Sequence, residues 1–348
     1  MDDQKTYKMI DLRSDTITRP SLAMREAMMK AEVGDDVFGE DPTINELQKM
    51  SADIFGKEAG LFIPSGTMGN EIAINVHTQQ GDEVIVDRLS HIVNFETGGP
   101  GFISGVNLVP LDGKNGILSA EQVEKAIRPE GLQFARTGLI CLENTHNYAG
   151  GSVYPFETIK EISEIASFKE IPMHLDGARI FNAVVATGIK PDEYSLYFDS
   201  ITFCISKGLG SPVGSVLLGS QEFIDQARIV RKILGGGMRQ AGILAAAGIY
   251  GLENNVERLI VDHKNAKKLA EALNKTKTFD IHPDEVESNI VIFRISDTSI
   301  SPSEASEKLG EKGILVFPFG ERQLRAVTHL DVSDKDIEDV CSRLIRYF

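Results

Sequence analysis

Two side chains able to do chemistry follow apolar runs that predict buried strands. Residues 171–175 lead directly to Asp176, and residues 199–205 lead through Ser206 to Lys207. The interval has room for one helix and one strand, so we expect the two strands to be near neighbours in one sheet. In open α/β sheets, ligands bind at the carboxyl ends of the strands. A carboxylate there can hold a pyridine nitrogen protonated and a lysine can form a Schiff base, so the pair indicates pyridoxal phosphate (PLP).

Each of these residues alone has a simpler interpretation. A lysine after a strand is more often a surface residue, and an aspartate there is often only a helix cap. Ser206 and Gly208 favour the functional interpretation of Lys207, because small flanking residues let the backbone approach a ligand closely. An amine held in such a place loses proton affinity and becomes nucleophilic.

A phosphate site and two histidines follow other predicted strands. Gly66 and Thr67 lie in a turn between a strand at 59–63 and a helix at 67–78, and a helix N-terminus offers free N–H groups to a phosphate. An ordinary strand-to-helix turn is the alternative. His91 and His146 follow the runs at 83–86 and 138–142. A flat ring at that edge could stack on a planar cofactor, and a hydrogen-bonded loop histidine is the alternative.

Three arginines have the chemistry to bind anions, since the guanidinium fork matches a carboxylate. Arg179 comes shortly after Asp176, so we expect it to face the same mouth. Arg325 lies near the C-terminus, and Arg239 follows three consecutive glycines. Those glycines indicate backbone packed tightly against a ligand, and a flexible loop is the alternative.

The remaining pattern predicts the elements that must position these residues. Thr43 to Glu46 predicts a capping box for a helix that ends at Gly56, and further helices are expected near 21–31 and 220–232. Seven strand-like runs alternate with helices, which predicts an α/β fold with a mostly parallel seven-stranded sheet covered by helices. The runs are 59–63, 83–86, 105–109, 138–142, 171–175, 199–205 and 213–218.

The pattern changes near residue 250. A helix over 253–274 is predicted there, with strands at 290–295 and 323–328 and helices at 301–312 and 333–347 following. We therefore expect a large cofactor-binding domain at 1–250, which includes the N-terminal segment, and a smaller α+β domain at 251–348.

Composition excludes some classes of function. The net charge is −15 with no basic run, so a nucleic-acid partner is not expected. The apolar runs are too short to span a bilayer, and residues 1–8 predict a polar leader rather than a signal peptide. The cysteines Cys141, Cys204 and Cys341 have no metal or disulfide spacing, which indicates reduced thiols in a cytoplasmic protein and no metal site.

At this point the residues match a family. The chain resembles the low-specificity L-threonine aldolases, PLP enzymes of the aspartate-aminotransferase fold type (fold type I), from about Met9 to the C-terminus. The segments that carry the resemblance are 10–16, 34–39, 65–67, 143–147, 174–179, 206–210, 235–240 and 325–329.

The resemblance implies how the cofactor is held. Lys207 corresponds to the Schiff-base lysine, Asp176 to the partner of the pyridine nitrogen, and His91 to the ring that stacks on the pyridine. Gly66 and Thr67 correspond to phosphate ligands. Catalysis is expected to depend on Lys207, Asp176 and His91.

The resemblance also implies a substrate site. Ser14, Arg179 and Arg325 correspond to a clamp on the substrate carboxylate, and Arg179 is also expected at the cofactor. His146 corresponds to a catalytic contact to the β-hydroxyl. Arg239 is expected to reach the phosphate from a neighbouring subunit, within a homotetramer built as a dimer of dimers.

Two positions depart from the family. Phe38 stands where many relatives have tyrosine, so a polar contact near the substrate is absent. Val93 and Asn94 stand where relatives often have an aromatic residue, which alters the shape of the pocket.

The implied reaction is retro-aldol cleavage of L-threonine, L-allo-threonine and related β-hydroxy-α-amino acids to glycine and an aldehyde. The alternative is another PLP reaction on the same fold, such as β-elimination or racemisation. The threo or erythro preference, the physiological aldehyde, any bound ion and the base for the β-hydroxyl (His91, His146 or a water) stay open at this stage.

Overall fold

The computed structural model describes residues 7–348, so most of the expected polar leader lies outside the described residues. A seven-stranded sheet has the order β2-β8-β7-β6-β5-β3-β4. Only β8 runs antiparallel to its neighbours, which confirms the mostly parallel sheet. The strands are β2 (Ala59–Ile63), β3 (Glu83–Asp87), β4 (Asn107–Leu111), β5 (Thr137–Glu143), β6 (Met173–Asp176), β7 (Ser200–Cys204) and β8 (Ser215–Gly219).

Side chains alternate between the two faces of this sheet, as period-2 strands require. On β2, Leu61 and Ile63 face helices α3 (Gly66–His77) and α9 (Gln221–Ile233). Phe62, between them, faces the opposite layer. That layer contains α2 (Pro42–Phe55), α5 (Ala120–Ala126), α6 (Phe156–Phe168), α7 (Ile180–Thr187) and α8 (Pro191–Ser195).

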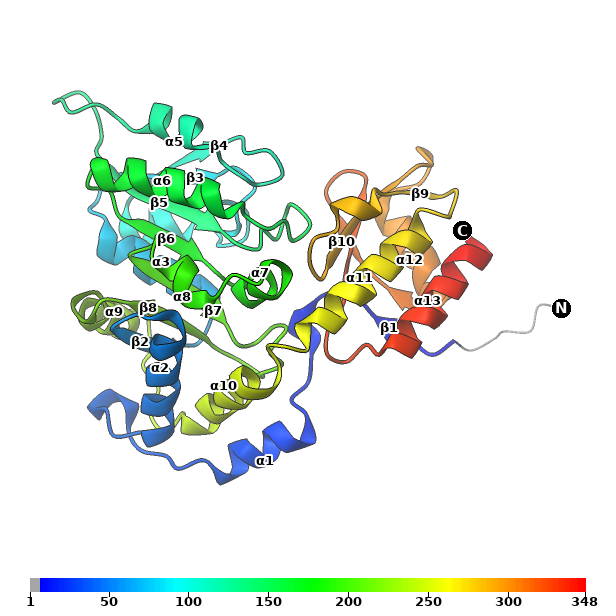
Figure 1. Ribbon diagram of the computed structural model, residues 1–348, viewed down its shortest axis with the longest axis horizontal. Helices are drawn as coiled ribbons and strands as arrows, with labels where there is room; N and C mark the ends of the chain where they lie inside the picture. The colour runs from blue at the N-terminus through cyan, green and yellow to red at the C-terminus, as the bar shows by residue number, and fades with distance from the viewer. Residues whose placement is uncertain (1–6) are drawn as a thin grey trace.

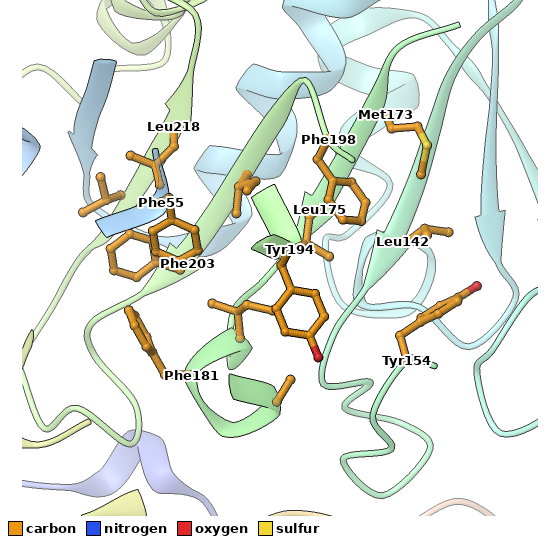
Figure 2. Close-up of a cluster of buried hydrophobic side chains, with 14 of the residues drawn as sticks. Phe55, Leu142, Tyr154, Met173, Leu175, Phe181, Tyr194, Phe198, Phe203 and Leu218 are labelled. Atoms are coloured by element: carbon orange, nitrogen blue, oxygen red, sulfur yellow. The ribbon is translucent and has the colours of Figure 1, made fainter. Parts of the chain in front are cut away.

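Aromatic side chains fill the core on the α2 face (Figure 2). The rings of Phe55 and Phe203 are stacked with centroids 5.3 Å apart, and Phe181 meets Phe203 edge to face at 5.5 Å. Such contacts contribute about 0.5–1.5 kcal/mol each beyond burial. They fix α2 and α7 against β7, the strand that leads to Lys207.

One predicted helix begins earlier than expected. α2 begins after Asp41, whose carboxylate accepts from Ile44 N–H at 3.0 Å, so the expected capping box at Thr43 is wrong. Pro42 at the first helical position explains the earlier start, because its fixed φ suits a helix and no N–H is lost. Gly56 ends the helix with φ 63°, as expected. α1 (Leu22–Lys30) is confirmed.

The helix expected at 253–274 begins later, as α11 (Leu259–Leu273), and the preceding helix α10 (Gly242–Asn254) was not expected. α10 is rich in alanine and glycine, and packs between α1 and α2. A helix covered on more than one side has no polar face, so its periodicity gives no signal.

The C-terminal region forms a second lobe beside the large sheet (Figure 1). Its antiparallel sheet has the order β12-β13-β10-β9. The lobe contains β9 (Phe279–Asp280), β10 (Ile290–Ile295), β11 (Ile314–Leu315), β12 (Phe317–Phe319), β13 (Gln323–Val327), α12 (Pro302–Glu311) and α13 (Asp334–Tyr347). Among the described residues, no helix combines the length and apolar character needed to cross a membrane.

The N-terminal segment packs with this second lobe. β1 (Ile10–Asp11) pairs in parallel with β11, and Ile10 and Leu12 are buried in the core of the lobe. We expected this segment with the large domain. The expected boundary at residue 250 falls within α10.

Candidate active site

Asp176 and Lys207 meet at the carboxyl edge of the large sheet. Asp176 ends β6, and Lys207 follows β7, its parallel neighbour. Asp176 is 3% exposed. Its burial alone would raise the pKa of the carboxyl, but the charges of His91 and Lys207 lower the pKa below its ordinary value. Asp176 is therefore a buried anion facing a lysine.

Hydrogen bonds fix the Asp176 carboxylate. Its Oδ2 accepts from Asn70 Nδ2 at 2.8 Å, and its Oδ1 accepts from the N–H of Ala178 at 3.1 Å. Each carboxylate oxygen can accept more than one hydrogen bond, so the group can still accept from a protonated ring nitrogen.

His91 is held at the same edge. It begins the short helix α4 (His91–Asn94), and its N–H donates to Glu143 Oε2 at 2.7 Å. The ring Nδ1 bonds to Glu96 Oε1 at 2.8 Å. Burial would lower the pKa of His91, but the bond to Glu96 and the charges of Asp176 and Glu143 raise it. The ring keeps about a quarter of its side-chain surface exposed (27%), so it stays accessible to a ligand.

The N-terminus of α3 provides the expected anion site. Ser65 caps the helix by accepting from Met68 N–H at 3.2 Å, and the N–H groups of Gly66 and Thr67 have no protein partner among the described residues. A Cβ on Gly66 would lie 2.8 Å from Cys204 Sγ. Glycine therefore lets the helix start directly against the end of β7, where its free N–H groups can meet a phosphate.

Arg239 is placed differently. Its guanidinium is largely exposed and forms an ion pair with Asp35 at 2.9 Å. Its contact with a phosphate stays a prediction.

Two other arginines converge on one amide oxygen. Arg179 Nη1 and Arg325 Nη1 donate to Asn147 Oδ1 at 3.3 Å and 3.1 Å. Arg179 also makes two bonds to the fully buried Asp15, at 2.7 Å and 2.6 Å. Burial and the neighbouring Arg179 lower the pKa of Arg325 to about 10. An oxygen ligand placed beside Asn147 would therefore meet two guanidinium groups.

Ser14 lies in the same region. Its hydroxyl accepts from Thr16 N–H at 3.2 Å, and Arg325 Nη2 donates to the carbonyl of the preceding residue, Arg13, at 3.3 Å. The structure thus brings together the three residues expected to bind a carboxylate.

His146 does not open onto this edge. Its ring is completely buried, with Nε2 bonded to Asp87 Oδ1 at 3.1 Å and Nδ1 accepting from Ala149 N–H at 3.3 Å. A contact from this ring to a substrate hydroxyl would have to replace one of these bonds. Phe38, 73% exposed, also lies on the surface.

Five residues of this site were not anticipated from the sequence. They support the expected ones through hydrogen bonds or ion pairs, and each lies in or beside a segment that the sequence had singled out. They are Asp15, Asn70, Glu96, Glu143 and Asn147.

A histidine and two carboxylates at this edge could also serve as metal ligands. Ligand atoms of His91, Glu96 and Asp176 lie within 4.8 Å of one another. Glu96 Oε1, however, already accepts from His91 Nδ1 and from Asn70 Nδ2, each at 2.8 Å. The cluster is therefore a hydrogen-bonded network as it stands.

The donor set fits PLP. A buried anion matches a protonated pyridine nitrogen, a lysine at the next strand end matches the aldehyde, and a free helix N-terminus matches the phosphate.

Comparison with known proteins gives the family. Residues 11–296 match the family model described as beta-eliminating lyase. This chain belongs to the beta-eliminating lyase family. It is 47% identical over 337 residues to the low specificity L-threonine aldolase of Escherichia coli K12, covering 96% of this chain and 98% of that one. It is 46% identical to low-specificity L-threonine aldolase 1 of Arabidopsis thaliana, covering 94% and 93%.

Solved structures support the fold. The threonine aldolase of Leishmania major superposes with a TM-score of 0.82 at 19% identity, covering 96% of this chain and 98% of that one. The serine palmitoyltransferase of Sphingomonas wittichii has a TM-score of 0.76 at 17% identity, covering 97% and 86%. The resemblance to threonine aldolases and the fold class are confirmed.

This beta-eliminating lyase also has a buried carboxyl pair behind its site. Glu71 on α3 is 2% exposed, and it contacts Glu96, the partner of His91. Burial, and then the charge of the neighbouring Glu96, raise the pKa of Glu71 to about 8. Glu71 is therefore protonated at neutral pH.

We expect this pair to make stability depend on pH. Between about pH 4.5 and 8 the unfolded chain has Glu71 ionised while the folded chain keeps it protonated, so stability falls as pH rises, by at most about 1.4 kcal/mol per pH unit. Glu71→Gln should flatten that fall in chemical denaturation measured from pH 5 to 9. Exposed Glu46→Gln is the control, and parallel curves for all three proteins would contradict the assignment.

Proposed function

We propose that this chain is a PLP-dependent lyase that cleaves L-threonine, L-allo-threonine and related β-hydroxy-α-amino acids to glycine and an aldehyde. The observation that carries the proposal is the meeting of Asp176 and Lys207 at one sheet edge. The paired guanidinium groups of Arg179 and Arg325 supply a site for the substrate carboxylate. Relatives named threonine aldolases at 46–47% identity support the reaction class.

Each residue at the cofactor has a distinct task. Lys207 would hold the cofactor covalently, and the N–H groups of Gly66 and Thr67 would bind its phosphate. The Asp176 anion would keep a proton on the pyridine nitrogen. When bound, PLP supplies an electron sink that weakens a bond at the substrate Cα. The accessible ring of His91 would be the residue that stacks on the cofactor ring.

The carboxylate clamp selects the bond that breaks. Arg179, Arg325 and Ser14 would hold the substrate carboxylate and so fix which bond at Cα is presented to the cofactor. A base takes the β-hydroxyl proton, the Cα–Cβ bond breaks to release the aldehyde, and a proton added at Cα gives glycine. Of the two histidines considered as the base, only His91 has an accessible ring.

Product analysis tests the proposed reaction. Incubation of the holoenzyme with L-threonine should give glycine and acetaldehyde in equal amounts. Borohydride reduction before peptide mapping should place the pyridoxyl group on Lys207. Ammonia with an α-keto acid would instead indicate β-elimination, and D-allo-threonine, the product of inversion at Cα alone, would indicate racemisation. A label on another lysine would remove Lys207 from its role.

Arg325→Lys tests the carboxylate clamp. Lysine keeps the charge but loses the fork, so KM for L-threonine should rise roughly tenfold or more, since hydrogen bonds to charged groups contribute about 1.5–3 kcal/mol. The visible spectrum of the bound cofactor should stay unchanged. Arg294→Lys, at an exposed position on the same small sheet, is the control. An unaltered KM in Arg325→Lys would exclude the clamp.

The proposed assembly is a homotetramer built from dimers that share their sites. Arg239 is exposed, and so are the large apolar side chains of Phe38, Ile229 and Ile233. A second copy of this chain would cover them, since exposed apolar surface can mark an interface. Reduced Cys141 and Cys204, both buried, support a cytoplasmic location.

Arg239→Ala should then release PLP more readily than the wild type, because an arginine that binds phosphate across the interface is lost. Cofactor loss on dilution, followed by sedimentation at the same concentrations, measures both effects. Arg346→Ala, on the exposed end of α13, is the control. A fully active monomer that retains PLP would refute the shared site.

A further inference from the structure

A buried chain of hydrogen bonds runs along one face of the large sheet. It begins at Asp176, at the carboxyl edge of the sheet, and ends at the opposite edge. We propose that this chain holds Asp176 in place and keeps it anionic, so that its members are positioning residues for the pyridine nitrogen. The inference rests on the role of Asp176 in the proposed function. In order, the members are His77, Ser200, His174, Asn70 and Asp176.

Every link has hydrogen-bond length. His77 Nε2 lies 2.8 Å from Ser200 Oγ, and Ser200 Oγ lies 2.9 Å from His174 Nδ1. His174 Nε2 lies 3.1 Å from Asn70 Oδ1. Asn70 Nδ2 lies 2.8 Å from Asp176 Oδ2. Apart from partly buried His77, all members are at most 3% exposed.

The sequence places these side chains on one surface for two reasons. His174 and Asp176 are two residues apart on β6, so they point to the same face of the sheet, and parallel pairing puts Ser200 beside His174. Asn70 and His77 are seven residues apart on α3, which is two helical turns, so they share the stripe that faces the strands.

The direction of the bonds follows from charge. Asn70 Nδ2 contacts two carboxylate oxygens, Glu96 Oε1 and Asp176 Oδ2. Only the NH₂ end of an amide can donate to both, so Asn70 Oδ1 faces His174 and must accept from Nε2–H. His174 Nδ1 is then an acceptor for the hydroxyl of Ser200, which in turn accepts from His77.

Every donor therefore points toward Asp176. Bonds aligned in this way polarise one another and strengthen the last bond in the series. Burial lowers the pKa of His174 to about 3 and that of His77 to about 4, so both rings are neutral near pH 7 and keep their donor and acceptor ends. An amide does not pass protons on readily, so Asn70 makes the chain a support rather than a proton path.

The apolar side chains around this chain of hydrogen bonds indicate that the chain serves the site. On the same face of the sheet, the flanking strands carry Leu61, Ile63, Val84, Val86 and Leu217. Buried polar groups stabilise a fold little compared with apolar groups of similar shape. The chain's members on the sheet lie on β6 and β7, the two strands that lead to Asp176 and Lys207, and its other two members lie on α3. Its far end at His77 lines a cleft of about 760 Å³ at the opposite edge of the sheet.

The experiment reads the proton on the pyridine nitrogen directly. Holoenzyme reconstituted with PLP carrying ¹⁵N in the ring is examined by ¹⁵N NMR from pH 6 to 9, and kcat and KM for L-threonine are measured in parallel. The variants are His174→Leu and Ser200→Ala, with His174→Gln to restore a donor toward Asn70. Ser51→Ala removes a buried hydroxyl on α2, outside the chain, and is the control.

We expect His174→Leu to lose the protonated ¹⁵N signal at a lower pH than wild type and to lower kcat roughly tenfold with KM nearly unchanged, because the bond to a charged group is weakened. Ser200→Ala should change the pH at which the signal is lost and kcat in the same direction, but by less. His174→Gln should recover part of the kcat that His174→Leu loses. Ser51→Ala should match wild type in signal and kcat.

Asp176→Asn separates the two levels of the argument. If Asp176→Asn loses the protonated signal while His174→Leu and Ser200→Ala keep wild-type signal and kcat, the supporting chain is overturned and the role of Asp176 stands. If Asp176→Asn itself keeps the signal, the proposed role of Asp176 fails first. Should His174→Leu not fold, Ser200→Ala decides alone, and a wild-type signal with wild-type kcat overturns the proposal.

Discussion

The structure depends on keeping one negative charge, that of Asp176, buried at the end of a central strand. An isolated carboxylate in such a place would take up a proton, because burial disfavours the charged form. Here His91 and Lys207 supply positive charge, and Asn70 and the N–H of Ala178 supply hydrogen bonds. The parallel pairing of β6 with β7 is what brings Lys207 to this carboxylate, so the sheet topology and the electrostatics are parts of one arrangement.

A second set of charges is balanced in a similar way where the two lobes meet. Arg179 lies on the large domain and Arg325 on β13 of the C-terminal lobe, and their like charges disfavour each other. Asp15 neutralises Arg179, and Asn147 gives both guanidinium groups an oxygen acceptor. Asp15 follows β1, which pairs with β11, so the N-terminal segment reaches the site together with the C-terminal lobe.

Much of the site follows from local rules. The seven strands, and Asp176 and Lys207 at two of their ends, could be predicted because apolar runs and strand-end polar residues are visible in short windows of sequence. The turn at Gly66 could be predicted for the same reason. The helix α10 could not, since its alanine-rich surface is covered on several sides and has no polar face. The sequence does not single out Asp41 as the cap of α2, because Thr43 and Glu46 also match a capping pattern.

The sequence by itself determined the order of elements, the pairing of a carboxylate with a lysine, and the resemblance to the threonine aldolases. Tertiary structure decided which polar groups touch. The bond from Asn70 to Asp176 joins residues 106 positions apart, and that from Arg179 to Asp15 joins residues 164 apart. Tertiary structure also buried the His146 ring and bonded it to Asp87. No periodicity encodes such contacts, because a hydrogen bond depends on side-chain positions within fractions of an ångström, which only the packed fold fixes.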